Sequence, residues 1–403
     1  MRILVLNQYF HPDRAATALL LTELCEDMAR HHEVQVVSGR PSYNPDQDAT
    51  PPPGGVDVRR AWSTSFDRRW MPGRLANYAS YLLGSALRAA AAQRPDVILA
   101  WTDPPMIGAI AAQVARLRRA PLVLGLQDVY PEVAIKLGRV DNPAAVAVLR
   151  VGSNAALRGA VAVVALGRDM SRRLTDRGVP EERIHVIPNW ADGRVVKPLC
   201  KPSALRRELG LEDSFVVMHS GNIGFSQNLD RLLDAAELLG EHPDVRIVIA
   251  GEGAGRDRLA AEIARRRLEN VKLIGYQPRA GLSESLGMAD LHVVSLLPDL
   301  AGCVVPSKVY GIMAAGRPFL AALEPWAEPA LIAEEERCGF RVDPGDAGAL
   351  AAAIVELRKA PLAEMGARAR NAFERKYDRP VATKRYRQLL ESAAQLHLPA
   401  QKS

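Results

Sequence analysis

The sequence has only four cysteines in 403 residues, and they lie far apart at positions 25, 200, 303 and 338. The absence of a C-x-x-C pair argues against a zinc site of that kind and against a disulfide framework. The sequence also lacks the H-E-x-x-H pattern of zinc hydrolases, the G-x-x-x-x-G-K-[ST] phosphate loop, the G-x-G-x-x-G dinucleotide fingerprint and the G-x-S-x-G nucleophile motif. These absences disfavour zinc hydrolases, phosphate-loop nucleotide-binding proteins, dinucleotide-binding enzymes and hydrolases with that nucleophile motif.

Long hydrophobic runs are absent too. The most apolar stretches, near residues 89–92 and 349–357, are interrupted by charge and are shorter than the roughly 18 residues of a membrane-spanning helix. The first residues begin a strand pattern at once, without the basic and apolar regions of an export signal. We therefore expect a cytoplasmic protein, with the inner face of the plasma membrane as the alternative location.

Positive charge is concentrated in the first half of the chain. The net charge is +6, and between residues 59 and 119 ten arginines stand against three acidic residues. An anionic partner or an anionic membrane surface would suit that half, while scattered solvated arginines are the alternative. The arginines are not interleaved with an aromatic platform, so nucleic acid is not expected as a partner.

Short apolar runs alternate with longer amphipathic stretches, which is typical of β-α-β units and a parallel sheet. One series of expected strands covers 3–7, 34–38, 56–61, 97–101, 122–126, 161–165 and 184–187. A second series covers 215–219, 246–250, 271–274, 291–295, 319–322 and 340–342. Two consecutive series predict two doubly wound domains, and the proline-containing segment 188–202 is the expected linker.

In such sheets, ligands bind at the carboxyl ends of the strands, and two glycine-containing segments of the second series follow strands. Residues 220–230 contain two glycines that would let backbone amides approach a phosphate, although a tight turn would look the same. Residues 251–255 contain three glycines and could be a turn only.

A third segment, 306–318, predicts a helix that starts near Ser307. A lysine in the first helical turn opposes the helix dipole, so Lys308 is better explained if it faces an anion than as a solvated side chain. Gly311, inside the same helix, suggests close approach by a ligand or by neighbouring backbone.

Two polar segments follow strands of the first series. Gln127, Asp128 and Glu132 offer an amide and two carboxylates that would orient a polyhydroxylated substrate, although Asp128 could cap a turn and Glu132 could lead a helix. The loop 7–17 is an expected wall of the site, and its His11 is more simply a surface histidine than an acid or base.

Together these segments resemble the retaining family-four glycosyltransferases of the GT-B fold, in particular the branch that builds bacterial capsule, O-antigen and colanic-acid-type polysaccharides. The resemblance extends over nearly the whole chain and is carried by residues 3–10, 37–43, 102–105, 127–132, 186–192, 220–228 and 306–318. It implies an α/β fold with two Rossmann-like domains facing a central cleft. The first domain, 1–195, would bind the acceptor and the second, 196–375, the nucleotide-sugar. The helix and tail in 376–403 would cross back to the first domain.

The resemblance also implies site residues. The catalytic set would be Asp128, Gln127 and Lys308. The nucleotide-sugar would be bound by Gly221, Asn222, Gln227, Glu252, Tyr276, Ser307, Lys308, Tyr310 and Gly311. The acceptor would be bound by Phe10, Arg14, Ala16, Asp103, Arg68 and Arg69. No metal or other cofactor is expected, and the oligomeric state is not indicated.

The sequence departs from the wider family at several positions. The usual Arg and Lys that bind the diphosphate fall at Asn222 and Gln227, so Lys308 is the best remaining cation. The usual pair of glutamates falls at Cys303 and Gly311, and the histidine often found beside the sugar falls at Gln127.

The resemblance implies transfer of a sugar from a nucleotide-sugar to an acceptor hydroxyl, with retention at the anomeric carbon. The donor would be UDP-linked, with an N-acetylhexosamine as one candidate sugar. The acceptor could be a polyprenyl-diphosphate sugar, reached through peripheral membrane contact by the basic stretch 66–74 and the amphipathic run to residue 87. The alternatives are a soluble aminocyclitol-like acceptor, a sugar-nucleotide epimerase and a non-catalytic nucleotide-sugar binding protein.

Overall fold

The computed structural model describes residues 1–13, 15–41, 51–64, 66 and 71–396. The chain divides into two compact units, of which unit 1 comprises residues 1–188 and 382–403 and unit 2 comprises residues 189–381. We describe each unit by itself. Two doubly wound parallel sheets are present, one in each unit, as the sequence predicted.

Unit 1 is built on a seven-stranded parallel sheet with the order β3-β2-β1-β4-β5-β6-β7. Its strands are β1 (Arg2–Leu6), β2 (Glu33–Ser38), β3 (Val56–Arg60), β4 (Val97–Trp101), β5 (Leu122–Gly125), β6 (Ala162–Ala165) and β7 (Ile184–Val186). The central strands β4, β5 and β6 are buried along their whole length. Burial on both faces explains why they are continuous apolar runs rather than alternating ones.

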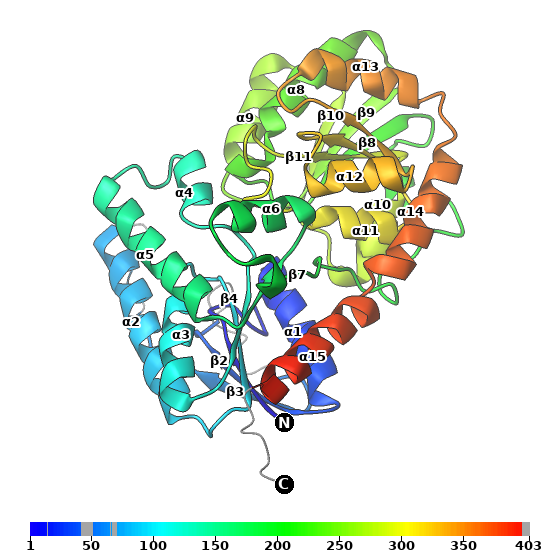
Figure 1. Cartoon of the computed structure of the whole chain (residues 1–403). Coiled ribbons are helices and arrows are strands. Elements are labelled where there is room, and N and C mark those ends of the chain that lie inside the picture. The colour runs from blue at the N-terminus through cyan, green and yellow to red at the C-terminus, as the bar shows by residue number, and fades with distance from the viewer. Residues whose placement is uncertain (14, 42–50, 65, 67–70, 397–403) are drawn as a thin grey trace. The chain divides into compact units, whose positions relative to one another are not determined.

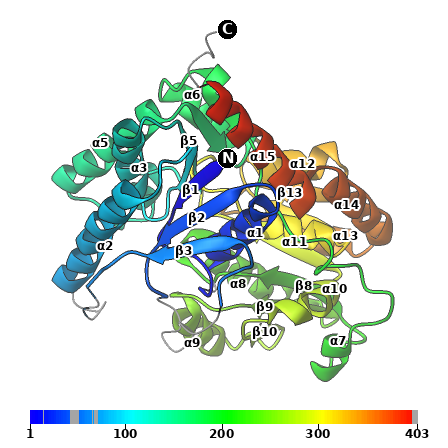
Figure 2. The same cartoon turned by 90° about the horizontal axis from the view of Figure 1, so that it is seen from below.

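Helices cover both faces of this sheet (Figures 1 and 2). Those of unit 1 are α1 (Ala16–Ala29), α2 (Met71–Ala91), α3 (Ile107–Arg118), α4 (Glu132–Lys136), α5 (Pro143–Gly159) and α6 (Arg168–Asp176), with a 3-10 turn η2 (Glu181–Arg183) before β7. The last helix, α15 (Arg379–Leu396), belongs to unit 1 from residue 382 onward. Its fully buried Tyr386 packs against Trp101 of β4, with ring centroids 6.2 Å apart.

Unit 2 is built on a six-stranded parallel sheet with the order β10-β9-β8-β11-β12-β13. Its strands are β8 (Phe215–Ser220), β9 (Val245–Ala250), β10 (Val271–Ile274), β11 (Leu291–Ser295), β12 (Phe319–Ala322) and β13 (Gly339–Val342). Its longer helices are α8 (Leu229–Leu238), α9 (Arg256–Arg266), α12 (Glu328–Glu335), α13 (Ala347–Leu357) and α14 (Leu362–Lys376). The shorter elements are α7 (Ala204–Glu208), η3 (Phe225–Gln227), η4 (Leu239–Glu241), η5 (Arg279–Gly281), α10 (Leu282–Gly287) and α11 (Lys308–Ala314).

Each sheet has a point at which the strand order reverses. In unit 1 that point lies between β1 and β4, and in unit 2 it lies between β8 and β11. Loops that leave neighbouring strands in opposite directions at such a point open a crevice at their carboxyl ends. The topology therefore directs attention to the loops after β1 and β4 in unit 1 and after β8 and β11 in unit 2.

The expected linker begins one residue before unit 2 and is bonded within that unit. Ala191 pairs with Asp378, and the amide of Gly193 donates to Asp378 Oδ1 at 3.0 Å. Arg379 Nη1 lies 3.4 Å from Asp192 Oδ2. These contacts place residues 189–195, which we expected in the first domain, with unit 2. Among the described residues, no helix is long and apolar enough to cross a membrane.

Candidate functional site

The loop after β8 carries the first predicted phosphate-binding segment. Gly221 has φ 136°, a conformation that residues with a side chain rarely adopt. The chain then passes through η3 and enters α8 at Asn228, which has φ 51° and makes no side-chain cap bond. Asn222 is exposed, and Gln227 is buried. The predicted arrangement of strand, glycine loop and helix is therefore present.

The second glycine segment, 251–255, is more than a turn, because it is bonded to the first loop. The amide of Ile223 donates to the carbonyl of Glu252 at 2.8 Å, and the amide of Gly255 donates to the carbonyl of Ile223 at 2.9 Å. A Cβ atom at Gly251 would lie 1.9 Å from the carbonyl oxygen of Gly221. Glycine is required at Gly251 because the backbones of the two loops approach this closely.

Lys308 lies at the start of α11, in the segment that follows β11, and its amine reaches the loop after β8. Its Nζ donates a hydrogen bond to Gln227 Oε1 at 2.8 Å and lies 3.0 Å from His219 Nε2. A Cβ atom at Gly221 would lie 3.5 Å from Lys308 Cε. The structure thus brings Gly221 and Gln227 of the segment 220–230 and Lys308 of the segment 306–318 into one cluster.

The charge of Lys308 is destabilised by its surroundings. Burial lowers the pKa of its amine from 10.5 to about 7. Burial, and then the charge of Lys308, lower the pKa of His219 well below its usual value, so this histidine is neutral and its Nε2 can accept from the amine. No ion pair to Lys308 is present among the described residues. A bound phosphate would supply the missing negative charge.

Three further residues that we predicted to bind the nucleotide-sugar form no hydrogen bond or ion pair with the described cluster of Gly221, Gln227 and Lys308. Tyr276 follows β10 and is 54% exposed, and Glu252 is exposed and forms an ion pair of 3.4 Å with Arg256. Ser307 occupies the N-cap position of α11, although its side chain makes no cap bond. These three remain predictions as ligand contacts.

Two residues of that set are packing residues in the structure. Tyr310 is fully buried, and its ring packs against that of Tyr377 in a tilted arrangement with centroids 5.1 Å apart, so its side chain is not available at the loop surface. A Cβ atom at Gly311 would lie 3.4 Å from Leu286 Cδ1, which is ordinary packing contact with a side chain. The expected close approach of a ligand or a backbone at Gly311 is therefore not seen.

In unit 1, two carboxylates follow the neighbouring strands β4 and β5, of which β4 borders the reversal of strand order. Asp103 comes after β4 and Asp128 after β5, and the strands pair in parallel. Thr102 joins the two segments, because its Oγ1 accepts from the amide of Gln127 at 3.0 Å and donates to the carbonyl of Asp128 at 3.4 Å. Gln127 is buried beside them.

Both carboxylates are held in surroundings that favour the protonated form. Burial raises the pKa of Asp128 from 3.8 to about 7, with a further contribution from the charge of Asp103. Burial also raises the pKa of Asp103 to about 6, against a hydrogen bond from Thr17 Oγ1 to Asp103 Oδ2 of 3.0 Å. Titration near neutral pH is a property of groups that bind or move protons, and it marks this pair as a candidate site.

The loop after β1 contributes to the same edge of the sheet. The amide of Gln8 donates to the carbonyl of Asp103 at 2.8 Å. Ala16 is exposed at the start of α1, whereas Phe10 is fully buried and therefore acts as a core residue rather than a contact for the acceptor. The predicted residues Arg14, Arg68 and Arg69 lie outside the described residues.

Some functional candidates were not predicted from the sequence, and Glu132, like Phe10 and Tyr310, has a structural role. His219 is the penultimate residue of β8, and its position just before a glycine loop was the available signal. Thr17 lies in the predicted loop 7–17 and Thr102 in the segment 102–105, but neither was predicted as a site residue. Glu132 does begin a helix, α4, and its carboxylate pairs with Arg177 at 3.4 Å, which is a structural role.

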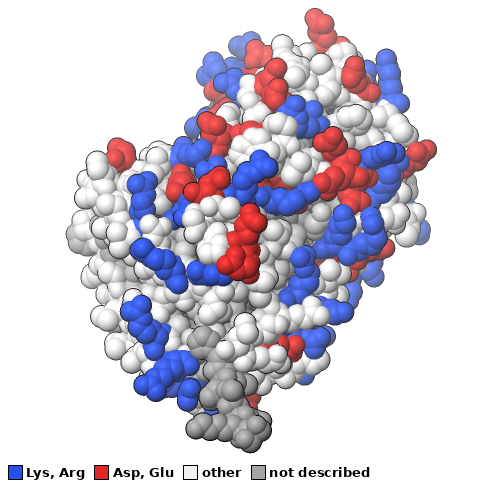
Figure 3. Space-filling model, in the orientation of Figure 1, with Lys and Arg blue, Asp and Glu red and all other residues white. Residues whose placement is uncertain are grey.

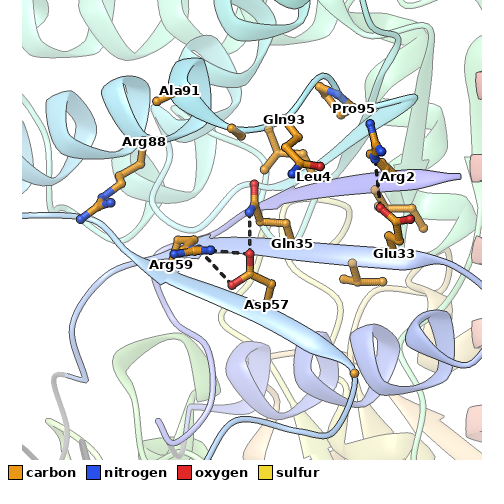
Figure 4. A pocket seen from close by; sticks show the side chains of 14 residues that line it. Arg2, Leu4, Glu33, Gln35, Asp57, Arg59, Arg88, Ala91, Gln93 and Pro95 are labelled. Atoms are coloured by element: carbon orange, nitrogen blue, oxygen red, sulfur yellow. Dashed lines mark hydrogen bonds and ion pairs between the residues drawn. The ribbon is translucent and has the colours of Figure 1, made fainter.

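A separate hollow lies at the other end of the first sheet (Figure 4), where β1, β2 and β3 begin and α2 ends. Four of its charged side chains are paired, Arg2 with Glu33 at 2.9 Å and Arg59 with Asp57 at 2.9 Å, and Arg88 lines it as well. Because it lies at the amino ends of the strands, this hollow is not the candidate site.

Comparison with known proteins agrees with the geometry. The model of the glycosyl transferase 4-like domain matches residues 17–190, and the model of glycosyl transferases group 1 matches residues 203–375. The chain belongs to the family-four glycosyltransferases of the GT-B fold.

Among curated relatives of this glycosyltransferase are WbjE of Pseudomonas aeruginosa, described as a glycosyltransferase, and WcaI of Escherichia coli K12, described as a glycosyl transferase of colanic acid biosynthesis. WbjE is 26% identical over 324 residues, which is 80% of this chain and 81% of WbjE. WcaI is 26% identical over 346 residues, which is 81% of this chain and 84% of WcaI.

Solved structures show the same fold for this glycosyltransferase. Anabaena HepE, whose crystal structure was determined in complex with UDP-glucose, has a TM-score of 0.76 and 21% identity. The match covers 97% of this chain and 100% of HepE.

Proposed function

We propose that this glycosyltransferase transfers a sugar from a UDP-sugar to an acceptor hydroxyl in the synthesis of a bacterial surface polysaccharide, with retention at the anomeric carbon. The observation that carries the proposal is the cluster of Lys308, Gly221 and Gln227 at the carboxyl edge of the second sheet. The UDP-glucose bound to HepE and the description of WcaI support the donor and the pathway class.

In the proposed reaction, the bond between the anomeric carbon and the diphosphate oxygen breaks, and its electron pair remains on the diphosphate. The acceptor oxygen bonds to the anomeric carbon on the same face, and the proton of the acceptor hydroxyl passes to a donor phosphate oxygen. Lys308 and the backbone amides near Gly221 stabilise the charge that develops on the leaving group. No protein base is required for this proton transfer.

Unit 1 would bind the acceptor. Asp128 and Gln127 lie at the carboxyl edge of its sheet, where Asp128 can accept a hydrogen bond from a sugar hydroxyl. Since the pKa of Asp128 is raised to about 7, this carboxylate can also hold a proton near neutral pH. We propose that these two residues position the sugar and the acceptor.

Binding is tested with a thermal-shift panel of UDP, GDP, ADP, UDP-glucose and UDP-N-acetylglucosamine on the full chain. A ligand at one hundred times its Kd stabilises the folded state by about 2.7 kcal/mol, so uridine nucleotides should raise the Tm measurably. Equal shifts with ADP and GDP would contradict the uridine preference. Absence of any shift would contradict the donor site as a whole.

Turnover separates the proposal from its alternatives. The transferase releases UDP only when an acceptor is present, and the anomeric configuration of its product, read by proton NMR, matches that of the donor. An epimerase would isomerise the donor without acceptor, and a binding protein would retain UDP-sugar without turnover. An inverted product would contradict retention while leaving sugar transfer intact.

A further inference from the structure

Three helices of unit 1 form one layer on a face of the first sheet and contain no acidic residue. These helices, α2, α3 and α5, lie side by side in Figures 1 and 2, and α3 packs against both of the others. None of their sequences contains Asp or Glu. Every other described helix of ten residues or more carries at least one carboxylate. The layer is therefore unusual within this chain.

The same layer exposes large apolar side chains. The exposed fractions are 59% for Leu83 and 64% for Leu87 on α2, 68% for Leu117 on α3, and 60% for Val148 and 66% for Val151 on α5. The first half of α5 is almost wholly apolar, and most of its residues are exposed. Apolar side chains grouped on adjacent helices indicate an interaction surface rather than isolated surface residues.

Arginines accompany these apolar residues. Arg116 and Arg119 at the end of α3 and Arg158 at the end of α5 line one groove, which contains no carboxylate. In the part of the chain that the structure describes, their side chains have no hydrogen bond or ion pair. Figure 3 shows uncharged surface with scattered basic side chains over α5 and the helices beside it. The surface thus combines apolar area with uncompensated positive charge.

The positive charge of this face favours an anionic lipid surface over a second copy of the chain as the partner that covers it. A second copy of the chain that docked through a twofold axis would place the same face against itself. Arginines would then oppose arginines, with no carboxylate on any of the three helices to pair with them. An anionic lipid surface provides both the negative charge and an apolar layer for the leucine and valine side chains.

We propose that the face formed by α2, α3 and α5 docks on an anionic lipid bilayer, with the arginines at the headgroups and the exposed leucines and valines in the boundary below them. This surface includes α2, which contains the predicted amphipathic run to residue 87, and it adds α3 and α5 to that prediction, whereas the predicted stretch 66–74 lies partly outside the described residues. The proposal adds a membrane partner to the glycosyltransferase and is independent of the donor site.

The test is flotation of the full chain with vesicles. One set contains equal parts of phosphatidylglycerol and phosphatidylcholine, and the other contains phosphatidylcholine alone. We expect binding to the anionic vesicles, much weaker binding to the neutral ones, and loss of binding as salt rises from about 0.1 M to about 0.5 M, because salt screens surface charge.

Two double variants probe the two components of the surface. V148E/V151E removes apolar area and adds negative charge, and R116E/R158E reverses two arginines. Since each basic residue near an anionic surface contributes about fivefold to binding, reversing two should weaken it by about 25-fold or more. The controls lie in unit 2: L238E, at a leucine that is 57% exposed, adds a negative charge to exposed apolar surface, and R207E/R265E reverses two exposed arginines.

Both controls should bind the anionic vesicles like the unaltered chain, and all variants should keep the same nucleotide-induced shift in Tm. Failure of the unaltered chain to bind anionic vesicles would overturn the membrane proposal and leave the transferase proposal standing. Equal loss in the control variants would also overturn it, because net charge alone would then explain binding. A dimer that V148E/V151E dissociates in light scattering, with vesicle binding unchanged, would assign the face to a second copy instead.

Discussion

Lys308 and Gln227 are joined by a hydrogen bond of 2.8 Å in which the lysine amine donates to the amide oxygen. The resemblance implies that the wider family has a lysine at the position of Gln227, and in this structure the amide at that position holds a lysine that comes from α11. The amine of this lysine lies beside the loop of Gly221.

Replacement of this lysine should remove most of the activity. Lys308→Ala is expected to lower kcat for sugar transfer by about 100-fold or more, the usual cost of losing one group that stabilises charge in a transition state. The variant should remain folded by circular dichroism. The control is Lys201→Ala, at an exposed lysine of the same unit, which should retain full activity. Near-normal transfer by the Lys308 variant would remove this residue from the site.

Lys308 should also leave a signature in the pH dependence of stability. Between pH 7 and about 10.4, the usual lysine pKa, the unfolded chain binds a proton that the folded chain does not. The contribution of Lys308 to stability therefore rises with pH in this window. Lys308→Met lacks this contribution, so its Tm relative to that of the unaltered chain should be highest below pH 7 and should fall as the pH rises to 9. A difference in Tm that stays constant from pH 6 to pH 9 would show that the lysine pKa is not lowered.

The close approach of the two glycine loops predicts a specific sensitivity. Gly251→Ala would place a methyl group 1.9 Å from the carbonyl oxygen of Gly221 and force a residue with a side chain to φ 148°. We expect a loss of about 2 kcal/mol or more in the free energy of unfolding, together with weaker binding of UDP. Chemical denaturation and a UDP titration measure the two effects. Gly240→Ala, where a Cβ atom would meet nothing within 4 Å, should have little effect on either measurement. A Gly251 variant that matched this control in both would contradict the packing.

Asp128 should show the opposite pH dependence to Lys308. Its pKa is raised from 3.8 to about 7, so between these values the folded chain holds a proton that the unfolded chain does not. The contribution of Asp128 to stability is therefore lost as the pH rises through 7. Asp128→Asn should gain Tm relative to the unaltered chain between pH 5 and pH 8, and it should reduce sugar transfer if the carboxylate positions a substrate.

Calorimetry at pH 5 and pH 8 measures the first of these effects. The control is Asp141→Asn, at an exposed carboxylate of unit 1, which should shift Tm equally at both pH values. If Asp128→Asn behaved like that control, Asp128 would be an ordinary solvated carboxylate.

The sequence by itself determined the strands of both sheets. All thirteen expected strands are present, with ends that differ by one residue at most. Strands buried on both faces, such as β4 and β12, are uninterrupted apolar runs, and this local pattern can be recognised in the sequence without knowing which strands lie beside them. The glycine segment after β8 and the start of α11 at Lys308 were visible for the same reason, because turn and helix-start signals are local.

Only the tertiary structure decided which of these segments meet. Whether Gly251 forms a simple turn or packs on Gly221 depends on the pairing of β8 with β9, which spacing in the sequence does not encode. Phe10 lies in a loop and Tyr310 near the start of a helix, and the sequence predicted that both contact a ligand. Both are buried instead, because elements distant in the sequence cover them. The environment of a side chain, and with it the lowered pKa of Lys308 and the raised pKa of Asp128, arises only when the folded chain excludes water around it.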